Sequence, residues 1–327
     1  MKPPRNVRFA AICIIAFFAQ AAFAAYPERP ARLLVPSSSG SGPDAIARLV
    51  AARMGTLLSQ QIVCDNRAGA NGVIASELVA RAAPDGYTLL MTSGGHTTNP
   101  HMYRKLPYDP IADFTPITQF ITSGGLVVVV TPSFGARTIA QLIEMARAAP
   151  GKIVYASAGV GNSTHLAGEM FNQAAGVRLT HVPYKGGGPA IIDVIGGQVP
   201  LMFASGAVSI PYVKSGRLRA LGYTGPKRSE QLPDVPTLNE SRLKGFEVTG
   251  WYGLYGPARL PPAIVNRLYE TTRDAVRHPE TRQALAQLGI ERRATQREGA
   301  RQRGETLEHR LGRSREHARH VCGVVQD

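Results

Sequence analysis

Two Ser- and Gly-rich segments have the composition of loops that bind an anion. Residues 37–42 read SSSGSG, and residues 157–164 read SAGVGNST. Glycine lets the backbone N–H groups of a loop turn towards a ligand, and Ser or Thr hydroxyls add donors. Both segments run from an apolar strand pattern into a helical pattern, and a helix N-terminus carries roughly half a positive charge. A carboxylate or a phosphate satisfies such a site without a Lys or Arg side chain.

Each loop alone is equally well interpreted as an ordinary connection between a strand and a helix. Their occurrence in both halves of the chain favours binding, because two facing loops can close on one ligand. Neither is a nucleotide motif, since the first lacks the P-loop lysine and the second lacks the third glycine of a dinucleotide fingerprint. Asp44 follows the first loop and can accept from a ligand hydroxyl or ammonium, although capping of its helix is the commoner role.

A catalytic interpretation would have to use Ser163 with His165, or Asp44 with His96. The sequence has no G-x-S-x-G elbow, no H-E-x-x-H pair and no catalytic Cys context. His165 falls in the first turn of its helix, where packing against the neighbouring loop is the commoner role. We therefore expect no enzymatic activity, no metal ion and no cofactor.

The elements around the two loops alternate between strand and helix in two series. The first has strand patterns at 32–35, 61–64 and 87–91, and the second has them at 126–130, 153–156 and near 182. Strands alternating with helices indicate parallel sheets with right-handed crossovers, and a chain of this length exceeds one hydrophobic core. The predicted fold is a two-lobed α/β protein in which a mostly parallel sheet flanked by helices forms each lobe. Ligands of such folds bind at the carboxyl ends of the strands.

The first residues have the pattern of a signal peptide. Lys2, Arg5 and Arg8 precede the apolar stretch 9–18, and small residues follow up to Ala24. This pattern predicts export with cleavage near Ala24, and the apolar stretch is too short for a membrane span. An uncleaved anchor is the alternative.

Cysteine and charge exclude two further classes of protein. Only Cys64 and Cys322 follow the predicted signal peptide, which gives neither a disulfide framework nor a zinc site. The chain has 37 Lys and Arg against 23 Asp and Glu, an excess that attracts anions. The basic residues are scattered up to about residue 290, without a stripe interleaved with aromatics, so we expect no binding to nucleic acid.

Six stretches, in this order, resemble the Bug family, the periplasmic receptors of tripartite tricarboxylate transporters. They are 65–72 (DNRAGANG), 83–89 (APDGYTL), 106–110 (LPYDP), 181–188 (HVPYKGGG), 232–237 (LPDVPT) and 250–253 (GWYG). The resemblance implies a flytrap-like periplasmic binding protein that holds a ligand carboxylate in the loop after the first strand and in the loop from Ser157 to His165. It also implies delivery of the ligand to a separate membrane permease. A sensory receptor with the same fold, which signals to a membrane partner, is the alternative.

The predicted ligand is a small organic acid or an amino acid. The family usually has an aromatic residue, a proline and a glycine cluster before the Asp at position 44, whereas this chain has serines, so the ligand class stays open. The predicted ligand-binding residues are Ser39, Gly40, Ser41, Asp44, Ser93, Ser157, Ala158, Gly161, Asn162, Ser163, Thr164, His165, Tyr184, Lys185 and Ser205. Trp251 fits either a cleft wall or a core position, and for Tyr252 we favour the core.

We predict a monomer with a signal peptide at 1–24, one lobe formed by 25–124 and 248–327, and a second formed by 125–247. The tail 291–327 has nine Arg but no Lys, and it lacks Phe, Ile, Met, Trp and Pro. Family members end in an amphipathic helix with aromatics, and here the resemblance is expected to stop at Ile290. A solvated, divergent terminus is one interpretation. The other is a frameshift near codon 291, which would make Cys322 accidental.

Overall fold

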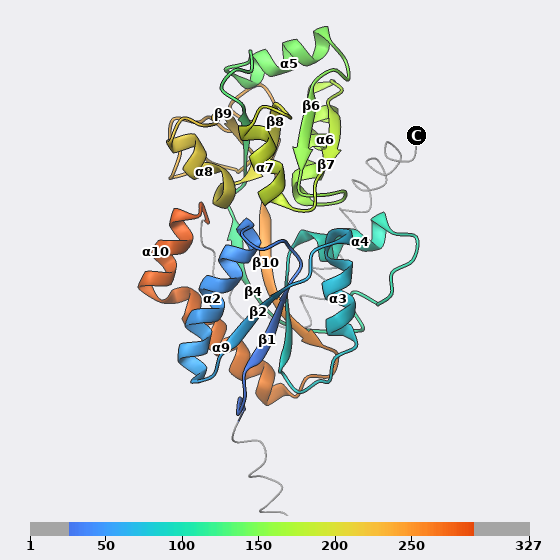
Figure 1. Cartoon of the computed structure of the whole chain (residues 1–327), viewed down its shortest axis with the longest axis vertical. Coiled ribbons are helices and arrows are strands. Elements are labelled where there is room, and N and C mark those ends of the chain that lie inside the picture. Colours follow the sequence, from blue (N-terminus) through green and yellow to red (C-terminus); the bar gives the residue numbers. More distant parts are fainter. Residues whose placement is uncertain (1–25, 291–327) are drawn as a thin grey trace, which may run out of the picture.

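The computed structural model describes residues 26–290, and these residues build two five-stranded sheets that lie one above the other (Figure 1). The lower sheet has the strand order β2-β1-β3-β10-β4, and the upper sheet has the order β7-β6-β8-β5-β9. The strands are β1 (Ala31–Val35), β2 (Ile62–Asn66), β3 (Thr88–Thr92), β4 (Phe114–Ser123), β5 (Leu126–Val130), β6 (Val154–Ser157), β7 (Thr180–Pro183), β8 (Leu201–Ser205), β9 (Arg219–Tyr223) and β10 (Gly250–Pro257). The predicted signal peptide and the tail 291–327 lie outside the described residues.

The two-lobed α/β fold is confirmed, but each sheet is mixed rather than mostly parallel. In each sheet two strand pairs are parallel and two are antiparallel. Every antiparallel pair contains β5 or β10, the strands that follow the two crossings between the sheets. Each of these strands enters its sheet at the end nearest the other sheet, so it runs against its neighbours.

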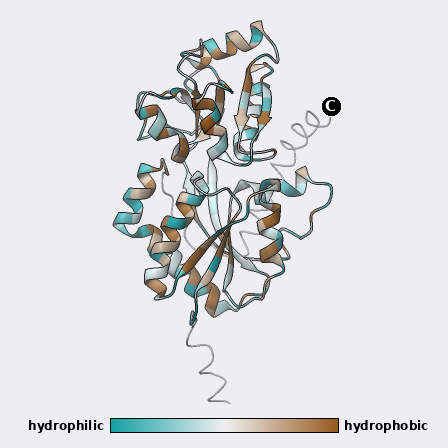
Figure 2. Cartoon of the chain, viewed as in Figure 1, coloured by the Kyte–Doolittle hydropathy of each residue, from teal (hydrophilic) through white to brown (hydrophobic). Residues whose placement is uncertain are grey.

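Helices cover both faces of each sheet. They are α2 (Gly42–Leu58), η1 (Ala70–Gly72), α3 (Val73–Ala80), α4 (Gly94–Met102), α5 (Ile139–Ala148), α6 (Ser163–Ala175), α7 (Gly187–Ile195), α8 (Gly206–Lys214), α9 (Pro262–Arg277) and α10 (Pro279–Gln287). In β1, Leu33 packs with residues of α2 and α9, whereas Leu34 packs with α3. In β5, Val128 packs with α5 and α6, and Val127 packs with α7 and α8. Because both faces are buried, these strands have continuous apolar sequences, as Figure 2 shows along the lower sheet.

The chain crosses between the sheets at residues 124–125 and again between β9 and β10. Thr224 joins the two crossings, because its Oγ1 accepts from the Leu126 N–H at 2.7 Å and donates to the Val248 carbonyl at 2.7 Å. The Gly250 N–H donates to Ser123 Oγ at 2.9 Å. The crossings therefore form one hydrogen-bonded hinge beside the space between the sheets.

Candidate functional site

A cavity of about 570 Å³ lies between the two sheets, a size typical of small-molecule sites. The strands other than β5 and β10 run towards it, so the loops that follow several of them open into it. The first residues of α2, α4, α6, α7 and α8 all line it, namely Gly42, Gly94, Ser163, Gly187 and Gly206. The positive ends of five helices therefore face one space.

The loop between β1 and α2 contributes only part of its predicted set to the cavity. Of the predicted residues Ser41 lines it, whereas Ser39 and Gly40 do not. Ser37 and Gly42, which were not predicted, also line it. Ser41 is the N-cap of α2, and its hydroxyl donates to Ser37 Oγ at 2.9 Å. Ser37 and Ser41 thus hydrogen-bond each other beside the cavity.

Asp44 lies outside the cavity lining and is only 3% exposed. Its carboxylate accepts from the Gly40 N–H at 2.8 Å and from Asn66 Nδ2 at 2.9 Å, and it pairs with Arg48 at 3.0 Å. Burial raises the pKa of Asp44, but the hydrogen bonds from Arg48 and Gly40 outweigh it and lower the pKa below the ordinary value. Asp44 therefore holds the loop in shape and has no free oxygen directed at a ligand.

The loop between β6 and α6 gives the cavity most of its predicted residues. Those that line the cavity are Ala158, Gly161, Asn162, Ser163 and Thr164, while Ser157 and His165 lie behind them. Asn162 is the N-cap of α6 and accepts from the Thr164 N–H at 3.1 Å. The Thr164 hydroxyl accepts from the Ala158 N–H at 2.8 Å and donates to Asn162 Oδ1 at 3.1 Å. Thr164 is therefore committed to the loop, whereas Ser163 makes only one long contact, at 3.4 Å, to Asn162 Oδ1.

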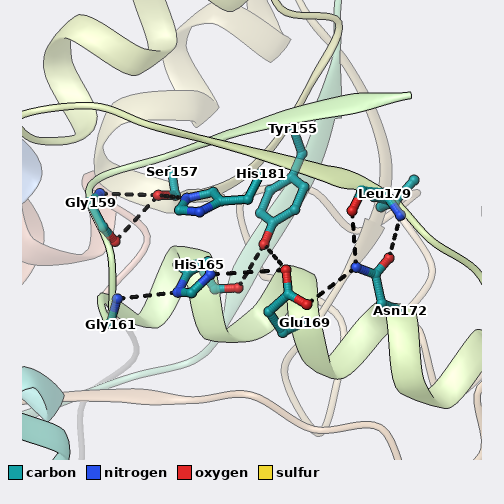
Figure 3. A network of polar contacts seen from close by, with 9 residues as sticks. All are labelled: Tyr155, Ser157, Gly159, Gly161, His165, Glu169, Asn172, Leu179 and His181. Atoms are coloured by element: carbon teal, nitrogen blue, oxygen red, sulfur yellow. Dashed lines mark hydrogen bonds and ion pairs between the residues drawn. The ribbon is translucent and has the colours of Figure 1, made fainter. Parts of the chain in front are cut away.

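A buried polar network supports this loop from behind (Figure 3). His165 Nδ1 accepts from the Gly161 N–H at 3.1 Å, and Ser157 Oγ lies 2.6 Å from His181 Nε2. The two imidazole rings stack with their centroids 3.9 Å apart. Tyr155 donates to Glu169 Oε1 at 2.6 Å on the far side of His165.

Both histidines of this network are held neutral. Burial lowers the pKa of His165, opposed by the charge of Glu169. Burial, and then the neighbouring His165, lower the pKa of His181 to about 4. A neutral His165 keeps Nδ1 free of a proton, so it can accept the Gly161 N–H. Sequence reasoning missed His181, although the stretch 181–188 was recognised.

The remaining predicted residues line the cavity from separate elements. Ser93 and Ser205 are the N-caps of α4 and α8, and Tyr184 and Lys185 follow β7. The Tyr184 hydroxyl donates to Asp193 at 2.7 Å, so only its ring is free for a ligand. Trp251 and Tyr252 of β10 also line the cavity. For Tyr252, burial raises the pKa to about 12, which keeps its hydroxyl protonated.

The two lobes touch across the cavity through a residue that sequence reasoning missed. Asn71 Nδ2 donates to the Gly161 carbonyl at 3.1 Å and to Asn99 Oδ1 at 2.8 Å. Asn71 has φ 51° and ψ 35°, the left-handed region that Asn tolerates better than most residues. The Thr98 hydroxyl reaches the same carbonyl at 3.4 Å. The only signal was the place of Asn71 in the stretch 65–72.

Glycines bring the lobes together elsewhere along this contact. A Cβ added at Gly42 would lie 3.0 Å from Ser205 Oγ and 3.1 Å from Ala207 Cβ. One added at Gly206 would lie 3.4 Å from the Gly289 Cα. The backbone of the first lobe therefore approaches the start of α8 at two places where no side chain intervenes.

This fold and cavity define a two-lobed binding protein. The model of the tripartite tricarboxylate transporter family receptor matches residues 46–311, and the chain belongs to this family. The match continues past Ile290, which corrects the expectation that the resemblance stops there. A UPF0065 protein of Pseudomonas sp. strain P51 is 42% identical over 81% of this chain and 79% of its own length.

Two solved structures are similar to the whole fold. The periplasmic binding protein BugD superposes with a TM-score of 0.78 at 36% identity, covering 81% of this chain and 89% of BugD. The R. palustris protein Rpa4515 with adipate superposes with a TM-score of 0.85 at 33% identity, covering 90% and 97%. This chain is thus a solute-binding receptor of the Bug type and not an enzyme. None of the helices within residues 26–290 has the length and hydrophobicity of a membrane span, and no cluster of metal-binding side chains occurs in that part of the chain.

Proposed function

We propose that this receptor captures a small carboxylate-bearing molecule in the cavity between its lobes. The observation that carries the proposal is the convergence of five helix N-termini on one space of about 570 Å³. The adipate bound by a structurally similar receptor supports the same ligand chemistry. Without the predicted signal peptide the chain keeps 34 Lys and Arg against 23 Asp and Glu, and this net charge of +11 attracts anions to the surface as a whole.

Within this site we assign direct ligand contacts to the predicted residues that line the cavity. In the first lobe these are Ser41 and Ser93, and in the second lobe Ala158, Gly161, Asn162, Ser163, Tyr184, Lys185 and Ser205. Four predicted residues instead hold the loops, because their polar atoms are engaged with neighbouring residues: Asp44, Ser157, Thr164 and His165. Ser39 and Gly40 are left as supporting residues of the first loop.

The wider role follows from membership in the family. We propose that the chain is exported to the periplasm, loses its first 24 residues, and delivers its ligand as a monomer to a membrane permease. We further propose that residues 25–124 with 248–327 form one lobe and residues 125–247 the other, a division supported by the order of the two sheets. No observation favours a signalling role over uptake.

Thermal unfolding with a panel of organic acids and amino acids tests the proposal. A ligand at 100 times its dissociation constant stabilises a fold by about 2.7 kcal/mol. The panel should contain adipate, and a hit should be confirmed by calorimetry. A Ser163→Ala variant that binds the confirmed ligand as tightly as the wild type would remove the β6–α6 loop from the site.

A further inference from the structure

We propose that Asn71 and His165 form a latch that holds the two lobes together through Gly161, and that protonation of His165 at mildly acidic pH opens this latch. The inference rests on the proposed function and deepens it, because parting of the lobes would release the ligand. Its basis is that the two backbone groups of Gly161 are held from opposite sides. The second lobe holds the Gly161 N–H, and the first lobe holds the Gly161 carbonyl.

The first lobe holds the Gly161 carbonyl through a fixed side-chain amide. Asn71 Nδ2 donates to this carbonyl at 3.1 Å, and the Thr98 hydroxyl reaches it at 3.4 Å. Asn99, which is only 1% exposed, accepts from Asn71 Nδ2 at 2.8 Å and donates to the Asn71 carbonyl at 3.2 Å. This reciprocal pair keeps the Asn71 donor directed at the other lobe. All three side chains are uncharged, so their charge does not change with pH.

The second lobe holds the Gly161 N–H through His165 Nδ1, which accepts it at 3.1 Å (Figure 3). Gly161 has φ 77°, in the left-handed region that favours glycine, and a Cβ added there would lie 3.1 Å from Asn71 Nδ2. The N–H and the carbonyl flank the same Cα atom. A displacement of the N–H away from His165 therefore also moves the carbonyl that Asn71 binds.

A proton on His165 Nδ1 would remove the acceptor that holds this loop. A neutral imidazole has one acceptor nitrogen, and an imidazolium has none. The protonated Nδ1 would face the Gly161 N–H, and because two N–H groups repel each other the loop has to move. Burial lowers the pKa of His165 in the latched form, and water that reaches the ring after the loop has moved relieves this effect. Proton binding and opening of the latch therefore favour each other.

The titratable groups around His165 direct the proton to it. Among the described residues, those that face the ring are Glu169 on the same helix, Tyr155 on β6 and His181 on β7. Glu169 Oε1 lies 3.9 Å from His165 Nε2 and stabilises an imidazolium there. The stacked ring of His181, whose centroid is 3.9 Å away, disfavours a second positive charge, so the pair takes up one proton. Burial raises the pKa of Tyr155, so its hydroxyl stays protonated throughout.

The fluorescence of Trp251 tests the latch without a ligand or a label. Trp251 is the only tryptophan of the sequence, and it lines the cavity from the hinge strand β10. As the pH falls from 7.5 to 5, we expect its emission maximum to move to longer wavelength, because parted lobes expose the indole to water. The radius of gyration from small-angle scattering should increase, while the far-UV circular dichroism stays constant. Unchanged emission and radius of gyration, or changes that accompany loss of the dichroism signal, would overturn the proposal.

A matched variant identifies the group that takes up the proton. In His165→Asn the amide Oδ1 takes the place of Nδ1 as the acceptor for the Gly161 N–H, but it does not titrate. We expect the emission maximum of this variant to stay at its pH 7.5 value down to pH 5. A shift as large as that of the wild type would show that His165 is not the sensor.

A second variant tests the first-lobe side of the latch. Asn71→Asp keeps the side-chain shape and tolerates the left-handed backbone, but its carboxylate repels the Gly161 carbonyl instead of donating to it. We expect Asn71→Asp to have the long-wavelength emission already at pH 7.5. Wild-type emission of this variant at both pH values would show that Asn71 does not hold the lobes together.

Calorimetry with adipate connects the latch to ligand release. Between pH 7.5 and 5.5 the dissociation constant of the wild type should rise about tenfold more than that of His165→Asn, as expected for the uptake of one proton. Protonation of adipate itself affects both proteins equally and cancels in this ratio. Equal changes in the two proteins would overturn the link between the proton and release. Absence of adipate binding at pH 7.5 would count against the proposed function alone, because the fluorescence titration needs no ligand.

Discussion

Replacing Gly42 by Ala should hold the two lobes further apart without destabilising the lobe that contains residue 42. Gly42 is the first residue of α2, and its φ lies outside the left-handed region, so Ala fits the helix. The added methyl would lie 3.1 Å from Ala207 Cβ, which cannot rotate away, and 3.0 Å from Ser205 Oγ. Carbon atoms in ordinary contact are about 3.5–4.0 Å apart, so the lobes have to separate by about 0.5 Å or more at this point.

The size of the effect follows from the cost of overpacking. Inserting a methyl group into a packed contact costs about 1–3 kcal/mol. This contact joins the two lobes, so relieving it separates the groups that line the cavity from each side, and the dissociation constant should rise about 5- to 150-fold. The free energy of unfolding should change little, because the preference of a helix for Ala over Gly is opposed by the crowding of a Cβ against the ring of the following Pro43.

Calorimetry with adipate and small-angle scattering with and without adipate measure the two consequences. The control is Gly196→Ala at the end of α7, where φ is −74°, the site lies outside the cavity, and the new Cβ would be 3.4 Å from the Ile192 carbonyl. The Gly196→Ala control should bind adipate with wild-type affinity, and adipate should reduce its radius of gyration as much as that of the wild type. A Gly42→Ala protein with wild-type affinity and wild-type compaction would show that the lobes do not meet as described.

Three further predictions test the site and its support. Thr92→Val should weaken adipate binding by about 1.5–3 kcal/mol, because the Thr92 side chain at the end of β3 lines the cavity and makes no hydrogen bond within residues 26–290. The same change at Thr131, which is buried outside the cavity, should leave binding unchanged; equal affinities of both variants would refute a ligand contact of the Thr92 hydroxyl. Ser163→Ala should weaken adipate binding with little change in melting temperature. Thr164→Ala should lower both the affinity for adipate and the melting temperature, because only Thr164 accepts a hydrogen bond from the Ala158 N–H. A melting temperature of Thr164→Ala equal to that of the wild type would contradict this structural role of Thr164. The folded pKa of His181, about 4, lies below the ordinary His value, so its contribution to stability is complete above about pH 6.5 and is lost as the pH falls towards 4. Between pH 7.5 and 5 the wild type should lose about 1 kcal/mol more stability in urea titrations than His181→Asn does, since solvent screens the partly exposed imidazole, and equal losses would show that His181 is not held neutral.

Much of the fold is predictable from the sequence, because the apolar patterns of the strands match how these strands are buried. The apolar segments of β1 and β5 are buried on both faces, so their sequences are continuous and easily recognised. The orientation of β5 and β10 was not predictable, because it depends on where the chain re-enters each sheet after a crossing. Nothing within a strand's own sequence records the direction of its neighbours.

The sequence by itself determined the two Ser/Gly loops, their position ahead of helices and the anion chemistry that follows, since these depend on residue type and on short spacings. Only the tertiary structure decided which of these groups are free. Asp44 is satisfied by Arg48 and Asn66, and Thr164 by its own loop, whereas the Thr92 side chain lines the cavity and makes no hydrogen bond within residues 26–290. Asn71 reaches Gly161, 90 residues further along the chain. Hydrogen bonds between residues so distant in sequence leave no periodic pattern, because their geometry is set by the packing of two sheets against each other.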